Sequence, residues 1–227
     1  MKAEFWHERW EKNQIGFHQN QVNTHLQDFW GRLDVPAGGT VFVPLCGKSS
    51  DMLWLRSQGY QVIGVELNRI AVQDFFAEND LQPVISQYGQ LERWEADGLV
   101  VYLGDFFALT PEDLQGCHAV FDRASLIALP PDMRPDYISH LRKLFPDGRG
   151  TLLITLEYDQ SIAGGPPFSV PEAEVVAYFE SAYQVRLLRS EDALDDLPGL
   201  KKRGVPAIDE KVWLLTTAKQ SAAVDID

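Results

Sequence analysis

The chain has 227 residues and a net charge of −13 at pH 7, and its length suits one large domain. Hydrophobic residues make up 45% of it and charged residues 23%, which is ordinary for a soluble globular protein. The negative charge disfavours nucleic acid and anionic membranes as partners, because both reward clustered lysine and arginine. No apolar run is long enough to span a bilayer, and the start has no signal-peptide pattern. With only two cysteines, Cys46 and Cys117, a cytoplasmic location is expected.

Residues 4–31 show a helical pattern rich in aromatic side chains, with a break near Gly16. A turn is predicted at Val35–Gly39. From the residues alone this segment is an amphipathic aromatic helix, and ordinary core packing is an alternative explanation for its aromatic side chains.

Strands and helices alternate through the middle of the chain. The predicted strands are Val41–Val43, Gln61–Glu66, Val100–Leu103, Ala119–Asp122 and Thr151–Glu157, and the predicted helices are Ser50–Gln58, Arg69–Asn79 and Pro135–Phe145. Near-continuous apolar strands are typical of a sheet whose two faces are both covered by helices. The alternation therefore predicts an α/β fold with a doubly wound, mostly parallel sheet.

The last third of the chain has a different pattern. A helix is predicted at Pro171–Ser181, and strands at residues 183–190 and 210–219. About 20 residues without a predicted helix join these strands, which favours antiparallel neighbours. The Gly/Pro-rich loop Asp159–Glu174 is either functional or a plain connector. Residues 220–227 are expected to be frayed.

Ligands of an open α/β sheet bind outside the carboxyl ends of its strands. Four segments follow such ends: Pro44–Asp51, Glu66–Asn68, Gly104–Phe107 and Asp122–Ser125. Glu66 lies 19 residues after Gly47, a spacing at which an acid accepts hydrogen bonds from the two hydroxyls of a ribose. The alternative interpretation is a solvated or N-capping acid.

The loop after the first strand, "PLCGKSSD", has one glycine. Its Gly47–Ser50 portion matches the end of a phosphate-binding P-loop, but Phe42 stands where that motif needs its first glycine. The dinucleotide pattern G-x-G-x-x-G is absent as well. A nucleoside cofactor without phosphates, such as S-adenosylmethionine, suits this loop best. Leu45 and Gly47 would then lie along its amino-acid and ribose parts through their backbone. An NTPase remains as an alternative that predicts binding of ATP and magnesium.

Two further segments offer ligand-binding side chains. Asp105 is placed to accept from an exocyclic amine of adenine and Phe106 to pack on its ring, although a turn with core phenylalanines explains them equally. Arg123 has the planar fork that suits a carboxylate or an electron-rich heterocycle, and a local ion pair with Asp122 is the alternative.

Metal and nucleophile chemistry are not indicated. His7, His18 and His25 lack the tight spacing of metal ligands, and no cysteine pair supports them, so no metal is expected. Cys46 has no base in a supporting pattern, which argues against a nucleophilic role.

Six segments together resemble one known family. They are "FWHERWEKNQIGFHQ", "VFVPLCGKSSDMLWL", "GYQVIGVELN", "GDFFAL", "FDRASLIALPPDMR" and "EKVWLLT". Over nearly the whole chain the sequence resembles the thiopurine S-methyltransferases in their bacterial form. The loop pattern is specific, because the general methyltransferase signature is richer in glycine.

The resemblance implies a Rossmann-like class I methyltransferase fold with a seven-stranded sheet, an antiparallel last strand and helices on both faces. Residues 1–34 would form a helical lid over a core of residues 35–227 within a single domain. The implied cofactor contacts are Trp10, Leu45, Gly47, Glu66, Asp105, Phe106 and Arg123. Phe17 and Arg123 would face the acceptor, and one of Lys201, Lys202 and Arg203 would correspond to a basic position on the acceptor side.

The implied reaction transfers a methyl group from S-adenosylmethionine to the sulfur of a thiopurine or another aromatic thiol, leaving S-adenosylhomocysteine. Arg123 would position the acceptor, with no general base and no metal. The protein would be a monomer whose partner is a small thiol. The alternatives are methylation of inorganic selenium or tellurium compounds or of another small thiol, and a non-catalytic cofactor-binding protein.

Overall fold

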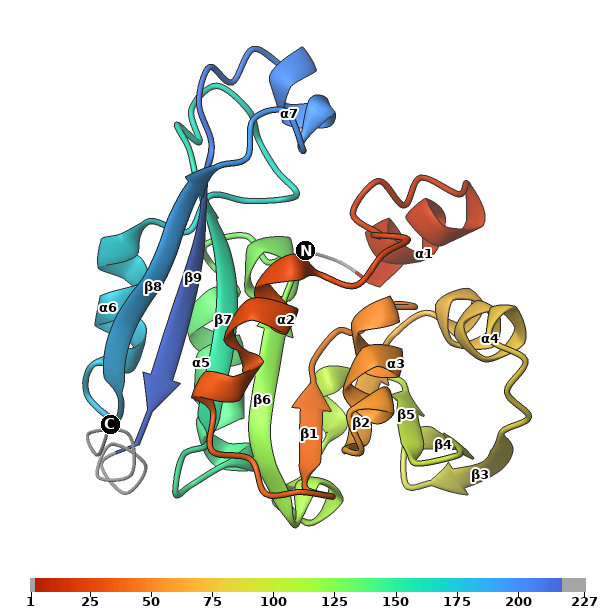
Figure 1. Ribbon diagram of the computed structural model, residues 1–227. Helices are drawn as coiled ribbons and strands as arrows, with labels where there is room; N and C mark the ends of the chain where they lie inside the picture. The colour runs from red at the N-terminus through yellow and green to blue at the C-terminus, as the bar shows by residue number, and fades with distance from the viewer. Residues whose placement is uncertain (1–2, 218–227) are drawn as a thin grey trace. The chain divides into compact units, whose positions relative to one another are not determined.

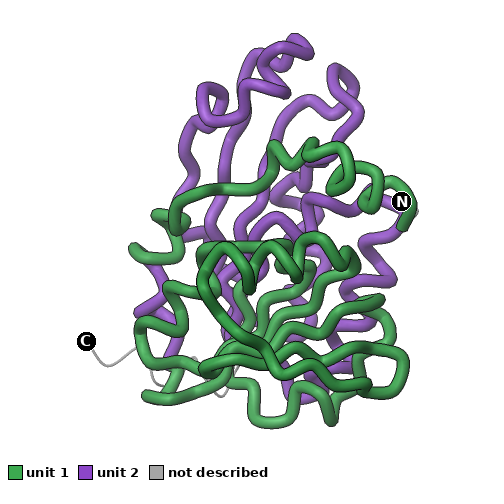
Figure 2. Tube along the Cα trace, turned by 90° about the vertical axis from the view of Figure 1, so that its right-hand side faces the viewer, with its two compact units in different colours: residues 1–28, 35–121 green, residues 29–34, 122–227 purple. Residues whose placement is uncertain are grey.

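The computed structural model describes residues 3–217, which fall into two compact units (Figure 2). The first unit contains the chain up to Asp28 and the range Val35–Phe121. The second contains Phe29–Asp34 and the chain from Asp122 onward. Each unit is described by itself.

The first unit contains most of the predicted strand and helix alternation (Figure 1). Its helices are α1 (Ala3–Glu11), α2 (Thr24–Phe29, whose last residue belongs to the second unit), α3 (Ser50–Ser57) and α4 (Arg69–Glu78), with 3-10 turns η2 (Phe106–Ala108) and η3 (Pro111–Leu114). Its strands are β1 (Thr40–Val43), β2 (Gln61–Glu66), β3 (Val84–Tyr88), β4 (Leu91–Ala96), β5 (Leu99–Leu103) and β6 (Cys117–Arg123), the last two residues of β6 belonging to the second unit.

The strand order in this unit is β3-β4-β5-β2-β1-β6. β1 pairs in parallel with β2 on one side, where Val41 faces Val62, and with β6 on the other. β2 pairs in parallel with β5. The chain thus moves outward from β1 through β2 to β5 and returns to the opposite side of β1. The strand order therefore reverses at β1, the point where ligands of open α/β sheets bind, and the doubly wound prediction is confirmed.

The structure has nine strands within residues 3–217, where the resemblance predicted seven. The difference is the antiparallel hairpin of β3 and β4, which joins the sheet through β5. The hairpin turns at Gly89, whose φ is +55°. All five residues of β3 are exposed, so this strand lacks the apolar stripe by which a half-buried strand is recognised.

The N-terminal segment has two short helices instead of the long helical stretch predicted for residues 4–31. The predicted break near Gly16 is correct, but it extends up to Asn23. The Asn23 side chain caps α2 by accepting from the backbone N–H groups of His25 and Leu26. The Asn23 N–H donates to buried Asp51 at 2.8 Å, which ties this segment to the start of α3.

The second unit is built on three antiparallel strands. They are β7 (Gly150–Glu157), β9 (Asp209–Thr216) and β8 (Gln184–Asp192), in that order. The remaining elements are η1 (Trp30–Arg32), η4 (Leu126–Ala128), α5 (Arg134–Leu144), α6 (Glu172–Phe179) and α7 (Pro198–Lys202). The antiparallel last strand is confirmed by the pairing of β9 with both neighbours.

The short helix α7 interrupts the connection between β8 and β9, where the sequence pattern predicted no helix. Proline at its first position and the turn at Arg203 limit it to five residues, too few to show a hydrophobic period. The predicted frayed end, residues 220–227, and the last two residues of the strand predicted at 210–219 lie outside the described residues.

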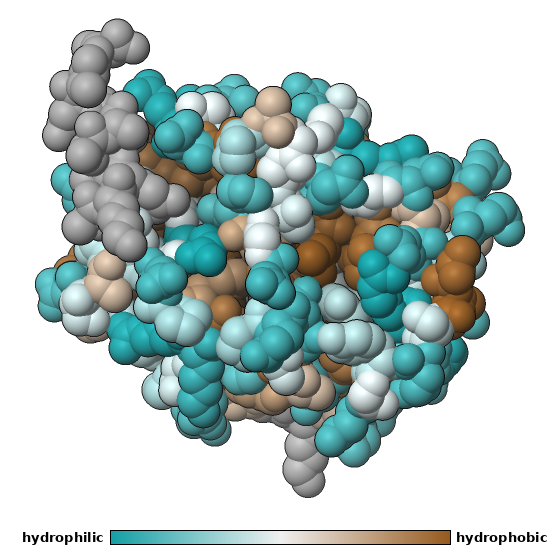
Figure 3. Space-filling view, turned by 90° about the horizontal axis from the view of Figure 1, so that it is seen from below, coloured by the Kyte–Doolittle hydropathy of each residue, from teal (hydrophilic) through white to brown (hydrophobic). Residues whose placement is uncertain are grey.

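Each unit has its own buried interior. In the second unit, Trp213 is 2% exposed and its indole N–H donates to Thr155 at 2.9 Å. Large exposed hydrophobic side chains include Val84, Ile85 and Tyr88 of β3, and Figure 3 gives the hydropathy of one face, where polar residues surround hydrophobic ones. Within the described residues no helix has both the length and the apolar character that a membrane crossing requires.

Candidate functional site

Glu66 is fixed at the carboxyl end of β2 by two backbone donors. Its Oε2 accepts from the N–H of Gly47 at 2.8 Å, and its Oε1 accepts from the N–H of Asn68 at 2.8 Å. The backbone carbonyl of Glu66 accepts from the N–H of Gly104 at 2.9 Å, which ties the end of β2 to the end of β5. The predicted acid therefore lies at the reversal point of the sheet and links three loops.

Burial raises the pKa of the Glu66 carboxyl, although the N–H groups of Asn68, Gly47 and Leu67 pull it downward by stabilising the carboxylate. The side chain is only 7% exposed. A buried acid kept in hydrogen-bonding contact with a loop is typical of a binding site rather than of a solvated strand end.

The loop between β1 and α3 adopts an unusual backbone. Leu45 and Gly47 both have positive φ, +43° and +54° respectively. For a leucine this conformation is strained, and such strain concentrates at ligand-binding segments. The turn brings the backbone of this loop to Glu66, since the N–H of Gly47 donates to that carboxylate.

Trp10 of α1 packs over the same loop. A Cβ atom placed on Gly47 would lie 3.5 Å from Cζ2 of Trp10, so the indole is in contact range of the glycine. Trp10 is 5% exposed, and its ring meets that of Phe17 edge-on at 5.7 Å. Phe17 also meets Trp6 at 5.6 Å. Trp10 and Phe17, both predicted as site residues, thus form an aromatic cluster with Trp6 within the N-terminal segment.

Lys48 forms ion pairs with two acidic residues of α4. Its ammonium lies 2.6 Å from Glu78 and 3.5 Å from Asp74, both on α4, and its side chain is 10% exposed. A P-loop lysine must instead reach the nucleotide phosphates. The NTPase interpretation therefore lacks the lysine that would contact the phosphates.

Cys46 serves packing in this loop. Burial, followed by the nearby Glu66 charge, raises the pKa of its thiol well above the usual value, so the thiolate that a nucleophile requires is disfavoured. A Cβ on Gly64 would lie 2.7 Å from its sulfur, which explains why β2 has a glycine there. The expectation that Cys46 is not a nucleophile agrees with this environment.

Asp105 and Phe106 follow β5. The exposed Asp105 caps η2 by accepting from the N–H of Phe107 at 3.0 Å. Phe106 is 3% exposed, whereas its neighbour Phe107 is 42% exposed. The position of Phe106 matches the alternative of a core phenylalanine, and its contact with a ligand stays a prediction.

Asn68 and His7 were not predicted as partners. The Asn68 side chain caps α4 and also meets the Nδ1 of His7, on α1, at 2.9 Å. A polar residue between a strand and a helix indicates an N-cap in sequence. No sequence signal indicates that a residue 61 positions away would bind the same amide.

A cavity of about 430 Å³ lies beside this pair. Its wall is formed by His7, Glu11, Leu67, Asn68, Arg69, Ile70, Gln87, Gln90, Glu92, Leu103 and Gly104. The predicted Glu66 and Asp105 are the sequence neighbours of wall residues Leu67 and Gly104. Gln87 of β3 and Glu92 of β4 are wall residues, so the hairpin that was not predicted from sequence contributes part of the wall.

Arg123 ends β6 and belongs to the second unit. It is half-buried, and the next residue, Ala124, has a φ of +64°. The preceding Asp122 accepts from the hydroxyl of Tyr137 at 2.7 Å and from the N–H of Leu126 at 3.2 Å. This strained turn after a buried strand resembles the one at Leu45 in the first unit.

The three basic residues near α7 have different surroundings. Lys201 is paired with Asp195 at 2.5 Å, and the guanidinium of Arg203 donates to the carbonyl of Gly199 at 3.2 Å. All three side chains, including Lys202, are exposed. Which of them meets an acceptor stays a prediction.

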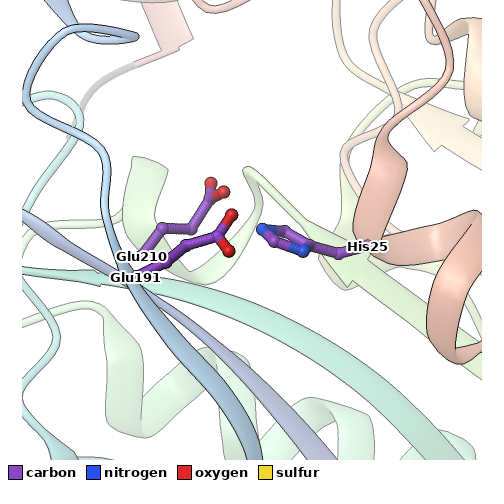
Figure 4. Close-up of side chains that lie close together, drawn as sticks. All are labelled: His25, Glu191 and Glu210. Carbon is purple, nitrogen blue, oxygen red and sulfur yellow. The ribbon is translucent and has the colours of Figure 1, made fainter.

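The second unit also has an acidic pair. Glu191 of β8 is the direct cross-strand partner of Glu210 of β9, and Figure 4 shows both carboxylates, together with His25 of the first unit. Like charges at opposed positions destabilise a sheet pair slightly. The spacing of histidines and cysteines in the sequence led us to expect no metal, and this expectation stays a prediction.

The first unit therefore brings together Leu45, Gly47, Glu66 and Trp10, with Phe17 adjoining Trp10. Asp105 follows the strand paired with β2. Arg123 is in the second unit, and its role stays a prediction.

Comparison with known proteins supports one family. A family model described as thiopurine S-methyltransferase matches residues 1–218. The thiopurine S-methyltransferase of Pseudomonas fluorescens (strain Pf0-1) is 50% identical over 213 residues, which cover 94% of this chain and 98% of the relative. That of Pseudomonas entomophila (strain L48) is 50% identical over 216 residues, covering 95% and 100%.

Solved structures show the fold. A SAM-dependent methyltransferase from Anabaena variabilis matches with a TM-score of 0.59 at 15% identity, covering 95% of this chain and 94% of that one. A Haemonchus contortus N-methyltransferase, solved with S-adenosylhomocysteine, matches with a TM-score of 0.60 at 8% identity, covering 86% and 52%. The class I methyltransferase fold is thereby confirmed, with the β3–β4 hairpin as an addition to the seven strands expected.

Proposed function

Because this chain belongs to the thiopurine S-methyltransferase family, we propose that it transfers a methyl group from S-adenosylmethionine to the sulfur of a thiopurine or another heterocyclic aromatic thiol, releasing S-adenosylhomocysteine. The observation that supports this most is the geometry of Glu66. Its carboxylate stands at the carboxyl end of β2, held by the N–H groups of Gly47 and Asn68.

The residues suit a nucleoside without phosphates. The Glu66 oxygens accept from the backbone N–H groups of Gly47 and Asn68, and the carboxylate, with about four acceptor sites in all, keeps capacity for a ribose hydroxyl. The adenosine half would lie along the cavity beside Leu67 and Gly104. A nucleotide is disfavoured because Lys48, the cation of this loop, is already paired with α4.

S-adenosylmethionine, when bound, supplies an electrophilic methyl group on a positively charged sulfonium. The aromatic cluster of Trp10 and Phe17 would exclude water, which stabilises separated charges better than it stabilises the transition state. Backbone groups of Leu45 and Gly47 would align the cofactor, and alignment alone contributes about 7–11 kcal/mol in favourable cases.

Arg123 would position the acceptor. Its guanidinium would hold the heterocycle and favour the thiolate form of the acceptor by lowering its pKa. An aromatic thiol is acidic enough to react without a general base. We further propose that the protein acts as a metal-free cytoplasmic monomer on small thiols, with residues 1–34 as its lid.

The test is a methyl-transfer assay in which one preparation meets several acceptors separately: a thiopurine, an aliphatic thiol, selenite and tellurite. S-methylated thiopurine with an equal amount of S-adenosylhomocysteine is the expected result. The variant Arg123→Ala should lower kcat more than it weakens cofactor binding. Faster methylation of selenite or tellurite would shift the acceptor class, and no product with any acceptor would support a cofactor-binding protein without catalysis.

A further inference from the structure

His7 contacts Asn68, two residues after Glu66 at the carboxyl end of β2. Its ring Nδ1 lies 2.9 Å from the side-chain amide nitrogen of Asn68. Asn68 is 3% exposed, so this amide is taken almost completely out of water. A buried amide nitrogen without an acceptor is costly, and His7 is the partner that the structure gives it.

The direction of this hydrogen bond is fixed by the other half of the amide. The Oδ1 of Asn68 accepts from the N–H groups of Ile70 at 2.8 Å and Ala71 at 3.4 Å, as the N-cap of α4. The atom that meets His7 must therefore be the NH2 group, which can only donate. The ring nitrogen of His7 must accept, and only a neutral imidazole has a nitrogen able to accept.

The same helix also contacts the loop on the other side of Glu66. α1 contributes His7 at Asn68 and Trp10 at Gly47. Asn68 and Gly47 each donate a backbone N–H to the Glu66 carboxylate. α1 is thus attached to both sides of Glu66, on one side by aromatic packing and on the other by a hydrogen bond.

Three charged residues line the cavity together with His7. Glu11 is on α1, Arg69 on α4 and Glu92 on β4. Arg69 is occupied by Glu92, with which it forms a two-point ion pair that includes a 3.0 Å bond. Glu11, one turn after His7 on the same helix, is the other charged residue of the cavity wall.

We infer that His7 is a positioning residue which, as a neutral imidazole accepting from Asn68, holds α1 against the strand end that binds the cofactor. The inference rests on the proposed function, because it assigns the His7–Asn68 contact to cofactor binding. A side chain at position 7 without an acceptor atom cannot form this bond and leaves the buried amide of Asn68 without its partner. Removing the acceptor should therefore weaken cofactor binding.

The test is calorimetric titration of S-adenosylhomocysteine at one fixed pH. Three proteins are compared: the parent, His7→Gln and His7→Phe. Glutamine keeps an acceptor oxygen but does not titrate, and phenylalanine keeps the bulk of the ring but offers no acceptor. Rescue of binding by glutamine but not by phenylalanine therefore reports on the acceptor at position 7 rather than on its bulk.

His7→Gln should bind like the parent, and His7→Phe roughly three- to tenfold more weakly, as expected for the loss of one buried hydrogen bond. Equal affinity of parent and His7→Phe, or an equal loss in both variants, would overturn the inference while leaving the methyltransferase proposal intact. If the parent itself bound no S-adenosylhomocysteine, the proposed function would fail and this inference with it.

Discussion

Gly47 and Glu66, 19 residues apart in sequence, are joined by a 2.8 Å hydrogen bond from the glycine N–H to the glutamate carboxylate. The bond joins the loop after β1 to the end of β2 at the point where the strand order reverses. It gives the acid a fixed orientation before any ligand arrives. Preorganisation of this kind lowers the entropic cost of binding.

Replacing Glu66 tests its role toward the ribose. Glu66→Ala should weaken binding of S-adenosylhomocysteine by on the order of 1–3 kcal/mol, because the ribose hydroxyls lose their acceptor. Glu66→Gln, which keeps one acceptor oxygen, should lie between. Calorimetric titration measures both, with the exposed Glu180→Gln as a control that should bind like the parent. Unchanged affinity in Glu66→Ala would remove this residue from the site.

Gly47→Ala tests the left-handed turn of the loop. The φ of +54° costs an alanine about 1–2 kcal/mol, so the free energy of unfolding should fall by about that amount. The added methyl itself would have ordinary contact with Trp10. Gly31→Ala is the matched control, because nothing lies within 4 Å of its added methyl and its φ is not in the left-handed range. Equal urea midpoints for both variants would contradict a strained turn at Gly47.

Tyr137→Phe should destabilise the second unit in a pH-dependent way. Burial raises the pKa of Asp122, and the Tyr137 hydroxyl is the first of the groups that oppose this rise. A carboxyl whose folded pKa is raised contributes stability in full below its unfolded pKa and loses it as pH rises through the folded pKa. Removing the hydroxyl raises the folded pKa further, so the cost should grow with pH toward roughly 1.5–3 kcal/mol.

Urea unfolding at acidic and mildly alkaline pH measures this effect. Tyr183→Phe is the control, since the Tyr183 hydroxyl accepts from the backbone N–H of Arg149 and contacts no buried carboxylate in that bond. Its cost should not change with pH over the same interval. A Tyr137→Phe cost that shrinks as pH rises would show that the sign of the linkage is wrong.

Glu174→Gln tests the anchor of the loop between β7 and α6. Arg134 has no exposed surface, and its guanidinium donates twice to Glu174, at 2.8 and 2.7 Å, and once to the carbonyl of Ser169. Removing the charge leaves a buried guanidinium uncompensated, at a cost on the order of 3 kcal/mol. Thermal unfolding should show the loss, whereas the exposed Glu180→Gln in the same unit should unfold like the parent. A loss no larger than that of Glu180→Gln would mean that water replaces the missing carboxylate.

The elements that the sequence predicted correctly are those with a strong local signal. β1, β2 and β5 are apolar runs, and α3 and α4 begin at polar caps, Ser49 and Asn68. The hairpin of β3 and β4 was missed because β3 buries none of its residues and so has no hydrophobic period. The extent of the break near Gly16 was not predicted, because the start of α2 is set by Asn23, whose N–H is fixed by Asp51 from a distant part of the chain.

The site shows the same division. Glu66 and Gly47 were predictable, because their spacing follows from the length of one strand–helix–strand unit. The contacts of His7 with Asn68 and of Lys48 with Glu78 were not, since they depend on how α1 and the loop after β1 pack on α4. Side-chain contacts between separate elements have no periodic signature in sequence.

The most direct test of the central claim is the melting temperature of the protein with S-adenosylmethionine, S-adenosylhomocysteine, NAD or ATP–magnesium in separate samples. A ligand at about 100 times its dissociation constant stabilises the folded state by roughly 2.7 kcal/mol, which for a chain of this size raises the melting temperature by roughly 5–11 °C. The account predicts this rise with the two sulfur nucleosides alone. A rise with ATP–magnesium or NAD instead, or with none of the four, would contradict a site built by Gly47 and Glu66 for S-adenosylmethionine.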